Sequence, residues 1–450
     1  MSVTFIECDR DTPYLLPPSL QDWLPEGHLA RFVVEIVEKL DLRALKEVYA
    51  GRGSQAYHPE MLLALLFYGY ATGVFSSRRL ERGTYDSVAF RYIAANTHPD
   101  HDTIATFRKR FVPQLKGMFV QILLVAQQMG VVKLGTVSLD GTKVKANASK
   151  HKALSYEHAC KLEDQLQAEV AELLRQAEAA DQADLPDGMS LPEELSRRTE
   201  RLAAIAEAKA EIERRAAERH AQEKTAYERT VAERADKEKH SGTKPRGQEP
   251  KPPKAGPRGK EQVNLTDGDS RIMPVRGSFE QAYNAQAAVD TVSLLIVSNH
   301  VSQQSNDKQE LEPALNSLTA LPEQLGKVTT LLADNGYLSE HNVGRCEQEH
   351  IVPCIAVGRD RHNLPLTERF GQPPPVPDDA DALTKMNHRL RTPEGRKLYA
   401  KRKSTVEPVF GIIKAVMGFC RFLLRGFAAV KGEWDLVCIA WNLKRLHTLA

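Results

Sequence analysis

Three acidic residues, distant from one another in the chain, stand where metal-assisted chemistry could use them. Asp140 and Asp334 each follow a short apolar run, and Glu407 lies in the helix-prone run from Ser404 to Lys414. Carboxylates that converge can hold two hard cations about 3.5–4 Å apart, which activate an attacking oxygen and stabilise a leaving one. The three acids are therefore candidate metal ligands, provided that the fold brings them together.

Each acid also has an ordinary structural interpretation. Asp140 precedes a glycine and Asp334 precedes Asn-Gly, and both are common turn sequences in which the aspartate acts as a cap. Glu407 and Lys414 are seven residues apart, so they share one face of a helix, where an exposed ion pair is the usual outcome. The carboxylates alone leave both interpretations open.

The segments around the two aspartates predict a mixed α/β sheet domain of five strands with flanking helices. The expected strands are listed in chain order: 137–140, 282–289, 293–301, 328–333 and 351–357. If the second strand is antiparallel to the first and the third to the second, the fourth can return parallel beside the first. Asp140 and Asp334 would then meet at the carboxyl ends of neighbouring strands, whereas Asp290 would lie at the other end as a turn residue.

A large insertion interrupts this sheet. Apolar residues recur three or four apart between residues 151 and 238, which predicts an inserted antiparallel helical hairpin. Residues 239–262 are rich in Lys, Pro and Gly and almost without apolar side chains, so we expect a disordered basic linker. The sheet domain would comprise residues 131–150 and 263–450. The hairpin could dimerise, grip DNA or simply pack on itself.

Residues 1–130 are predicted to form a helical N-terminal domain. A helix expected to begin at Asp102 leads into the basic cluster Arg108, Lys109 and Arg110. Such a cluster suits a helix-turn-helix-like DNA reader, but it equally suits the solvated side of an ordinary helical bundle.

The charge of the chain is uneven. The net charge of +2 over 450 residues says little about partners, but from Arg391 onward twelve Lys or Arg stand against four Asp or Glu. Lys143 and Lys145 also follow Asp140 closely. Such an excess attracts phosphate backbones or forms a solvated basic face, and charge alone does not separate the two.

Cysteine usage and hydropathy indicate a cytoplasmic protein. The six cysteines have no paired spacing, which favours reduced thiols. The longest apolar run, Met61 to Phe75, is shorter than the roughly 20 residues of a membrane helix, and the acidic start has no signal-peptide pattern. Cys346, His350 and Cys354 are spaced by four and could suggest zinc, but a packing role for the cysteines is favoured.

Several segments together resemble bacterial insertion-sequence transposases of the DDE class. They are VSLDGTKVKANASKHKALSY from Val137, RIMPVRGSFEQAYNAQAAVD ending at Asp290, LLADNGYLSE around Asp334 and YAKRKSTVEPVFGIIK from Tyr399. The segments HPEMLLALLFYGYATGVFSSRRLE and HDTIATFRKRF resemble the helical N-terminal domain of one large group of these enzymes. The resemblance covers nearly the whole chain, with its motifs in the expected order.

The resemblance implies an RNase H-like catalytic fold, with Asp140, Asp334 and Glu407 as catalytic and metal-binding residues for two Mg²⁺ or Mn²⁺ ions. It implies transposon-end and target DNA as partners, a homodimer in the active complex and association with the nucleoid when DNA is bound. The family signature implies that DNA phosphates are contacted by Tyr399, by either Arg402 or Lys403, and by Lys414. Arg402 keeps the family spacing to Tyr399, whereas Lys403 keeps the family spacing to Glu407. The other expected DNA-binding residues are Lys143, Lys145, Arg108, Lys109 and Arg110.

Two rival functions share parts of this pattern. A nuclease on the same fold would use the same metal site but would not join DNA ends. A catalytically silent DNA-binding protein would retain the basic segments only, although the presence of all three acids counts against it.

Overall fold

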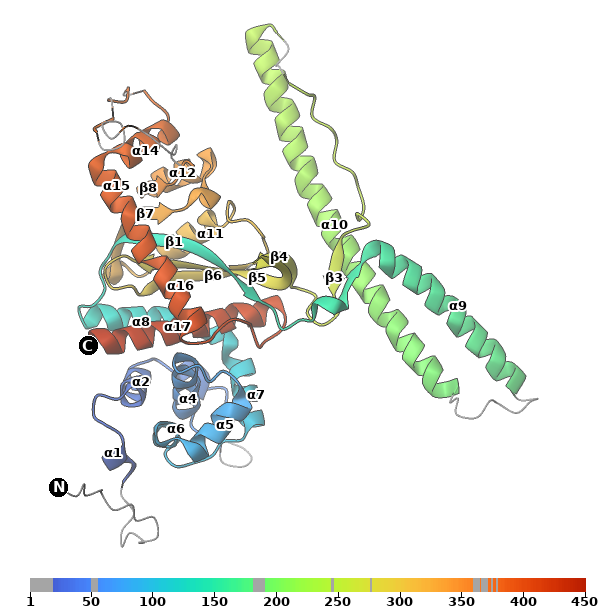
Figure 1. Cartoon of the computed structure of the whole chain (residues 1–450), viewed down its shortest axis with the longest axis horizontal. Coiled ribbons are helices and arrows are strands. Elements are labelled where there is room, and N and C mark those ends of the chain that lie inside the picture. The colour runs from blue at the N-terminus through green and yellow to red at the C-terminus, as the bar shows by residue number, and fades with distance from the viewer. Residues whose placement is uncertain are drawn as a thin grey trace, which may run out of the picture. The chain divides into compact units, whose positions relative to one another are not determined.

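The computed structural model covers the whole chain and describes residues 19–49, 56–180, 191–243, 247–275, 277–358, 365, 371–373, 375–377 and 379–450 (Figure 1). The chain divides into two compact units, each described by itself. The sheet unit comprises Met1–Val144 and Asn284–Ala450, and the hairpin unit comprises Lys145–Tyr283. Residues 1–130, expected as a separate domain, belong to the same unit as the sheet.

A mixed sheet forms the centre of the sheet unit, with strand order β6, β5, β1, β7, β8. The bounds of these strands are β1 Leu134–Lys145, β5 Ser278–Asp290, β6 Ile296–Ser302, β7 Gly326–Ala333 and β8 Val352–Ile355. β5 and β6 pair antiparallel, whereas β1, β7 and β8 are parallel. The expected five strands and their directions are thus confirmed, with β1 in the middle.

β1 runs antiparallel to β5 and is longer than predicted. Backbone hydrogen bonds join Thr291 to Thr136 and Ala146 to Gln281, in opposite order along the two strands. The strand expected to end at Asp140 continues to Lys145. Its polar second half stays in strand conformation because β5 alongside satisfies the backbone groups.

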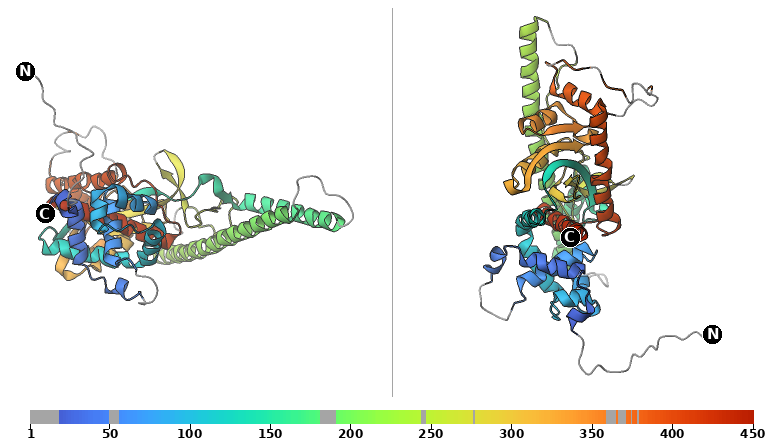
Figure 2. Two further views of the ribbon diagram at one scale, coloured as in Figure 1. Left: turned by 90° about the horizontal axis from the view of Figure 1, so that it is seen from below. Right: turned by 90° about the vertical axis from the view of Figure 1, so that its left-hand side faces the viewer.

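Helices from the C-terminal part of the chain pack on this sheet. α11 (Leu311–Thr319) contacts β6 and β7, and both α12 (Glu340–Gln348) and α14 (Ala382–Arg391) contact β8. α15 (Pro393–Ala400) and the short 3-10 helix η5 (Lys401–Ser404) lead into α16 (Val406–Ala415). Figure 2 shows these helices, in orange and red, next to the sheet.

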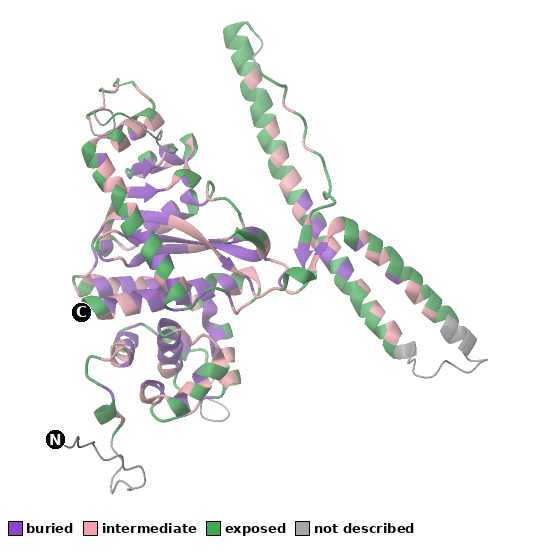
Figure 3. Ribbon diagram, in the orientation of Figure 1, coloured by how far each residue is buried: buried purple, intermediate pink, exposed green. Residues whose placement is uncertain are grey.

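The long helix α17 (Phe427–Leu449) joins the N-terminal helices to the sheet. It packs on β6, α8 and α4, and nearly all of its central residues are buried (Figure 3). Trp434 donates its indole N–H to the Gln286 carbonyl, and the Asn442 amide bonds both backbone groups of Ile296. Helix α17 therefore contacts both the N-terminal helices and the sheet.

The N-terminal helices are α1 Leu20–Trp23, α2 Leu29–Glu38, α3 Arg43–Lys46, α4 Pro59–Ala71, α5 Ser77–Asp86, α6 Val88–Ile93, α7 His101–Phe111 and α8 Leu115–Gln128. Pro59 occupies the first position of α4, where its missing N–H costs nothing, and the helix is buried almost all round. α7 is capped by Asp100, whose carboxylate accepts from the Thr103 N–H, so the helix begins before the expected start at Asp102.

The hairpin unit is built on two long helices, as expected from its apolar spacing. α9 (Tyr156–Ala180) and α10 (Leu191–Ser241) pack against each other, most closely along the first half of α9 (Figure 1). Their shared core includes Leu166, Ile205 and Ile212, together with Leu154 and Val263 from the short antiparallel pair β2 (Ala153–Ser155) and β3 (Gln262–Asn264). Beyond this core, the second half of α10 is mostly exposed (Figure 3).

The basic segment expected to be a disordered linker differs from that expectation where the structure describes it. Residues 239–241 complete α10, and residues 247–261 form no helix or strand but follow α10 back toward β3 (Figure 1). Arg234 donates to the Gln248 carbonyl, Arg219 donates to the Gly256 carbonyl, and Arg258 pairs with Glu223. Arginines of α10 thus satisfy carbonyls of an extended chain that cannot bury apolar surface.

A sixth strand, β4 (Arg271–Val275), pairs antiparallel with the first residues of β5 inside the hairpin unit. Gly277 in the intervening turn has a φ of 81°, a conformation that glycine adopts readily. Among the helices that the structure describes, none has the length and apolar character needed to cross a membrane.

Candidate active site

The parallel pairing of β1 with β7 brings the two aspartates together. Ser138 is in register with Leu332, and Asp140 and Asp334 each stand two residues farther along these neighbouring strands. Asp140 lies within β1, and Asp334 directly follows β7 and caps the short helix η4 (Asn335–Tyr337). The two aspartates are thus neighbours, as expected, but Asp140 lies within its strand and not at the strand's carboxyl end.

Each aspartate divides its two oxygens between different tasks. Asp140 Oδ1 accepts from the Gly141 N–H at 2.8 Å, and Asp334 Oδ1 accepts from the Gly336 N–H at 2.7 Å. The Oδ2 atoms of both aspartates instead face the guanidinium of Arg402. Asp334 is thus a cap, whereas Asp140 bonds the next residue of its own strand, and in both cases one carboxylate oxygen is left for a ligand.

Glu407 approaches from α16, on a segment far away in the sequence. Thr405 occupies the N-cap position, so Pro408 falls in the first turn and does not kink the helix. Phe410 and Ile413 are buried, as the helical spacing predicted, and Glu407 lies on the exposed side.

The guanidinium of Arg402, on η5, contacts all three acids. Its Nη2 lies 3.1 Å from Asp140 Oδ2 and 3.5 Å from Asp334 Oδ2, and its Nη1 lies 3.0 Å from Glu407 Oε1. The Arg402 side chain is 11% exposed, against 51% for Glu407. We call Asp140, Asp334, Glu407 and Arg402 the acid cluster. Three carboxylates from β1, β7 and α16 converge on one cation.

Burial and charge act in opposite directions on the pKa values of this cluster. Burial raises the pKa of Asp140 to about 6, although Arg402 and the Gly141 N–H lower it. Burial lowers the pKa of Arg402, but Asp140, Tyr399 and the other two acids raise it by more, so it lies above its ordinary value. Tyr399 is half-buried, and burial raises its pKa, so its phenol keeps its proton and can donate a hydrogen bond.

A buried polar network behind the aspartates was not predicted from the sequence. Asp307 Oδ1 accepts from Asn284 Nδ2 at 2.7 Å, from Gln286 Nε2 at 2.8 Å and from Lys143 Nζ at 3.1 Å. The Tyr337 hydroxyl donates to Gln286 Oε1. Asn284 and Gln286 are two residues apart in a buried strand and so face the same side, which is the signal that could have revealed the network.

This network packs directly against the backbone next to the two aspartates. A Cβ placed on Gly141 would lie 2.2 Å from Gln286 Nε2 and 2.8 Å from Asp307 Oδ1, and one placed on Gly336 would lie 3.7 Å from Asp307 Oδ2. The side chain of Asp307 is therefore close to the backbone that follows both Asp140 and Asp334.

Three of the expected DNA-binding lysines are engaged within the protein. Lys143 pairs with Asp307, and Lys145 pairs with Glu280 at 3.0 Å. Lys414 donates to the Thr142 hydroxyl and to the Lys143 carbonyl, so it anchors α16 to β1. Lys403 is exposed beside Arg402.

The basic cluster of α7 is divided by the fold. Arg108 is buried and donates to the Phe75 carbonyl at 2.9 Å and to the Tyr70 hydroxyl at 3.3 Å, so the expectation that it contacts DNA is corrected to a structural role. Its charge offsets that of the buried Glu433. Lys109 and Arg110 are exposed, with Arg110 stacked over the Tyr49 ring.

Asp290 and the cysteines have the structural roles expected of them. Asp290 is buried and its Oδ2 accepts from the backbone N–H groups of Val292 and Ser293. Cys346 and Cys354 are buried, which raises the pKa of both thiols.

The donor set of the acid cluster suits a hard divalent cation, because all three ligands would be carboxylate oxygens. Within the described residues, no three Asp, Glu, His or Cys side chains are placed as a ready metal site. In the acid cluster the reason is visible, since the Arg402 guanidinium stands between the carboxylates.

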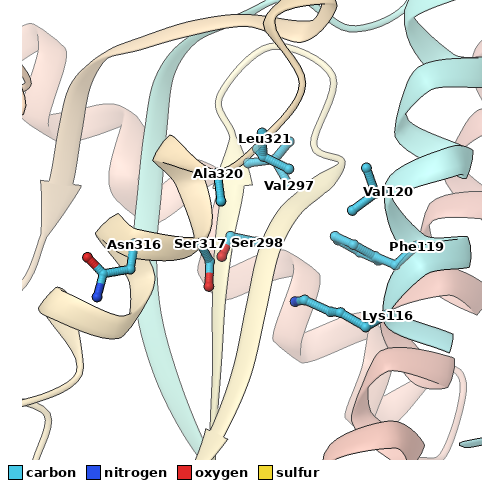
Figure 4. A pocket seen from close by; sticks show the side chains of 9 residues that line it. All are labelled: Lys116, Phe119, Val120, Val297, Ser298, Asn316, Ser317, Ala320 and Leu321. Carbon is cyan, nitrogen blue, oxygen red and sulfur yellow. The ribbon is translucent and has the colours of Figure 1, made fainter. Parts of the chain in front are cut away.

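A separate cavity of about 280 Å³ lies between α8, β6 and α11 (Figure 4). Lys116 and Phe119 line one side, and Ser298 and Ser317 the other. None of its lining residues belongs to the acid cluster.

Comparison with known families matches two stretches of the chain. Residues 18–110 match the family described as Transposase domain (DUF772), and residues 250–443 match the family described as Transposase DDE domain. Together the two matches cover more than half of the chain. The chain belongs to the DDE transposases. No curated protein and no solved structure matches this transposase.

The second match contains Asp334, Arg402 and Glu407, whereas Asp140 lies outside both matched ranges. Asp140 is included in the acid cluster because the parallel register of β1 and β7 places it beside Asp334 in this transposase. Its mixed α/β sheet and helical N-terminal part are those of an RNase H-like DDE enzyme with an appended helical region.

Proposed function

We propose that this transposase cleaves DNA phosphodiester bonds at the ends of an insertion sequence and joins the freed 3′-hydroxyl to target DNA. The observation that carries the proposal is the convergence of Asp140, Asp334 and Glu407 on the Arg402 guanidinium. Three acids separated by up to 267 residues share one point only if the fold is built to place them there.

The three carboxylates are the proposed holders of two Mg²⁺ or Mn²⁺ ions. When bound, such ions lower the pKa of an attacking water or hydroxyl and stabilise the departing oxygen. The chain itself supplies position and charge. Asp140 and Asp334 would bind through Oδ2, because Oδ1 of each is held by backbone N–H groups.

DNA contacts are proposed for residues next to the acid cluster and for the exposed part of the α7 basic cluster. Tyr399 offers a protonated phenol, and Lys403, the residue after Arg402, offers an exposed ammonium. Lys109 and Arg110 complete the proposed set. We further propose a homodimer as the active complex on DNA.

A cleavage assay tests the proposal. The substrate is a labelled duplex ending in the inverted repeat that flanks the gene, incubated with Mg²⁺ or with a chelator. We expect cleavage with Mg²⁺ only, and a loss of about a hundred- to a thousandfold in Asp140→Asn, because one of the proposed metal ligands is removed. Metal-independent cleavage, or full activity of Asp140→Asn, would contradict the proposal.

Strand transfer is tested separately. Duplex ends that are already cut expose the 3′-hydroxyl, and a supercoiled plasmid serves as target. Joined products are expected from the wild-type transposase and not from Glu407→Gln. Cleavage without joining under the same conditions would instead identify a nuclease. Light scattering of the complex with DNA measures whether two chains assemble.

A further inference from the structure

The Arg402 guanidinium and divalent cations need the same oxygen atoms. Arg402 contacts Oδ2 of both aspartates and Oε1 of Glu407, the atoms that the proposed metal site uses. A carboxylate oxygen 3.0 or 3.1 Å from a guanidinium nitrogen directs a lone pair to that N–H. Arg402 in this position therefore competes with metal ions for their ligands.

Arg402 is only partly satisfied where it lies. Its Nε is buried and has no hydrogen-bond partner among the described residues. Its side chain is 11% exposed, so water does not readily take that place. A buried N–H group without a hydrogen-bond partner costs free energy, so the carboxylates stabilise Arg402 in this position less than they otherwise would. The position is held by charge and not by a complete set of hydrogen bonds.

We propose that Arg402 is a built-in counter-cation of the acid cluster, and that it must leave the carboxylates before metal ions bind there. A DNA phosphate beside the cluster provides the alternative partner, because a guanidinium binds phosphate through two parallel hydrogen bonds. The inference rests on the proposed function of the acid cluster and adds that DNA binding and metal binding are coupled through Arg402.

The coupling follows from charge balance. Three converging carboxylates repel one another unless a cation lies between them. Arg402 supplies that cation without metal, and metal ions replace it. Because binding free energies are reciprocal, DNA that draws Arg402 away strengthens metal binding, and metal strengthens DNA binding by the same factor.

Mn²⁺ titration by calorimetry without DNA provides the main test. In Arg402→Gln the competing cation is removed, and we expect Mn²⁺ to bind about tenfold more tightly than in the wild type, equivalent to about 1.4 kcal/mol. Lys403→Gln is the matched control, because it removes one positive charge at the next residue, for which no ion pair occurs among the described residues. Its Mn²⁺ affinity should stay within about twofold of the wild type, since exposed charges interact weakly.

The outcomes separate this inference from the proposed function. Equal Mn²⁺ affinity in Arg402→Gln and the wild type, with binding abolished in Asp140→Asn, would overturn the role of Arg402 and leave the metal site standing. No Mn²⁺ binding in any variant would overturn both. Equal tightening in Lys403→Gln and Arg402→Gln would show a general charge effect and would also overturn the inference.

Thermal unfolding gives a second readout that does not depend on activity. In a chelator, Arg402→Gln should unfold at a lower temperature than the wild type, because the carboxylates lose the cation that contacts all three of them. Addition of Mn²⁺ should restore the unfolding temperature. A purely structural arginine would give a loss that Mn²⁺ does not repair. Arg402→Lys keeps the positive charge without the planar guanidinium, so its unfolding temperature in a chelator should lie between those of the wild type and Arg402→Gln. This variant provides the test if Arg402→Gln does not fold.

The link to DNA is measured with the inverted-repeat duplex. Mn²⁺ should raise the DNA affinity of the wild type by about the factor by which DNA raises its Mn²⁺ affinity. In Arg402→Gln that enhancement should fall by several-fold, since no internal cation has to be displaced. An unchanged enhancement would contradict the coupling.

Discussion

The carboxylates of Asp140 and Asp334 each divide their two oxygens between the local backbone and the proposed metal site. Oδ1 of each fixes the local backbone, and this leaves Oδ2 aimed at the point where β1, β7 and α16 meet. The hydrogen bond from the backbone restricts the carboxylate rotation, so the reactive oxygen is oriented before any ligand arrives. Glu407, which is 51% exposed, is oriented mainly through Arg402.

Asp307 is predicted to be a positioning residue for the acid cluster. In Asp307→Asn the negative charge that gathers Lys143, Asn284 and Gln286 is lost, and the backbone next to Asp140 and Asp334 loses its support. Changes behind a metal site typically cost about 10–100-fold in activity or metal affinity, and we expect a loss in that range.

The measurement is the Mg²⁺-dependent cleavage rate together with Mn²⁺ affinity. Glu280→Gln is the control, because it removes the carboxylate partner of another β1 lysine, Lys145, outside the buried network. Unchanged cleavage and affinity in Asp307→Asn would refute the positioning role. An unfolding midpoint near that of the wild type distinguishes a misplaced acid cluster from general destabilisation.

Asp435 gives the stability of the sheet unit a predicted pH dependence. Burial raises its pKa from 3.8 to about 6, although Lys116, 3.8 Å away, lowers it. A raised carboxyl pKa means that the folded state binds the proton more tightly, so stability is greatest below the unfolded pKa and falls as pH rises through about 6. The full loss is about 3 kcal/mol.

Urea unfolding in a chelator between pH 4 and pH 7 measures this dependence. Asp435→Asn should flatten the fall in stability over that range, since its side chain does not titrate. The pKa of Asp140 is also raised to about 6, so Asp140→Asn is needed to account for the second contribution in the same window. A slope unaltered by Asp435→Asn would contradict the prediction.

Helix α17 packs against both the N-terminal helices and the sheet. Gly432 lets the 3-10 helix η1 (Val112–Gln114) approach closely, because a Cβ there would lie 2.2 Å from Val112 Cγ1 and 3.0 Å from the Val112 carbonyl oxygen. The missing side chain thus sets the distance between the N-terminal helices and α17.

Gly432→Ala should destabilise the sheet unit. Overpacking a close contact costs about 1–3 kcal/mol, which exceeds the gain of up to about 1 kcal/mol from replacing glycine in a helix. Gly411→Ala in α16 is the control, because nothing lies within 4 Å of a Cβ at that position, and it should stabilise the protein by up to about 1 kcal/mol. Denaturant unfolding of both variants compares them.

The double variant Val112→Ala with Gly432→Ala tests the cause. Removal of Val112 Cγ1 should restore part of the lost stability, although the carbonyl contact remains. A double variant no more stable than the additive sum would show that the strain arises elsewhere.

The two compact units of the chain are expected to open separately. The hairpin unit has its own small core, in which Ile212 and Ile205 are 1% exposed. Ile212→Ala should cost about 2–5 kcal/mol within that unit. Hydrogen exchange should accelerate in α9 and α10 and remain unchanged in β7. Val231→Ala, on the exposed half of α10, is the control and should change exchange little. Equal acceleration in β7 would show that the whole molecule unfolds as one.

Much of the molecule follows from local patterns in its sequence. Alternating and continuous apolar runs predicted the five strands, and the spacing of Leu162, Leu166 and Ile205 predicted the inserted hairpin. These predictions succeed because the repeat of apolar residues along a strand or helix depends on the chain itself. The family motifs pointed to Asp334 and Glu407 and left Arg402 and Lys403 as alternatives.

Contacts between distant segments decided the rest. The burial of Arg108 depends on Tyr70 and Glu433, and the network of Asp307 depends on β1 and β5. Whether Arg402 or Lys403 faces the acids also depends on how η5 leads into α16. The sequence by itself determined which side chains can do chemistry. Tertiary structure decided which of them share a point in space, because convergence arises from strand register and helix packing over long separations.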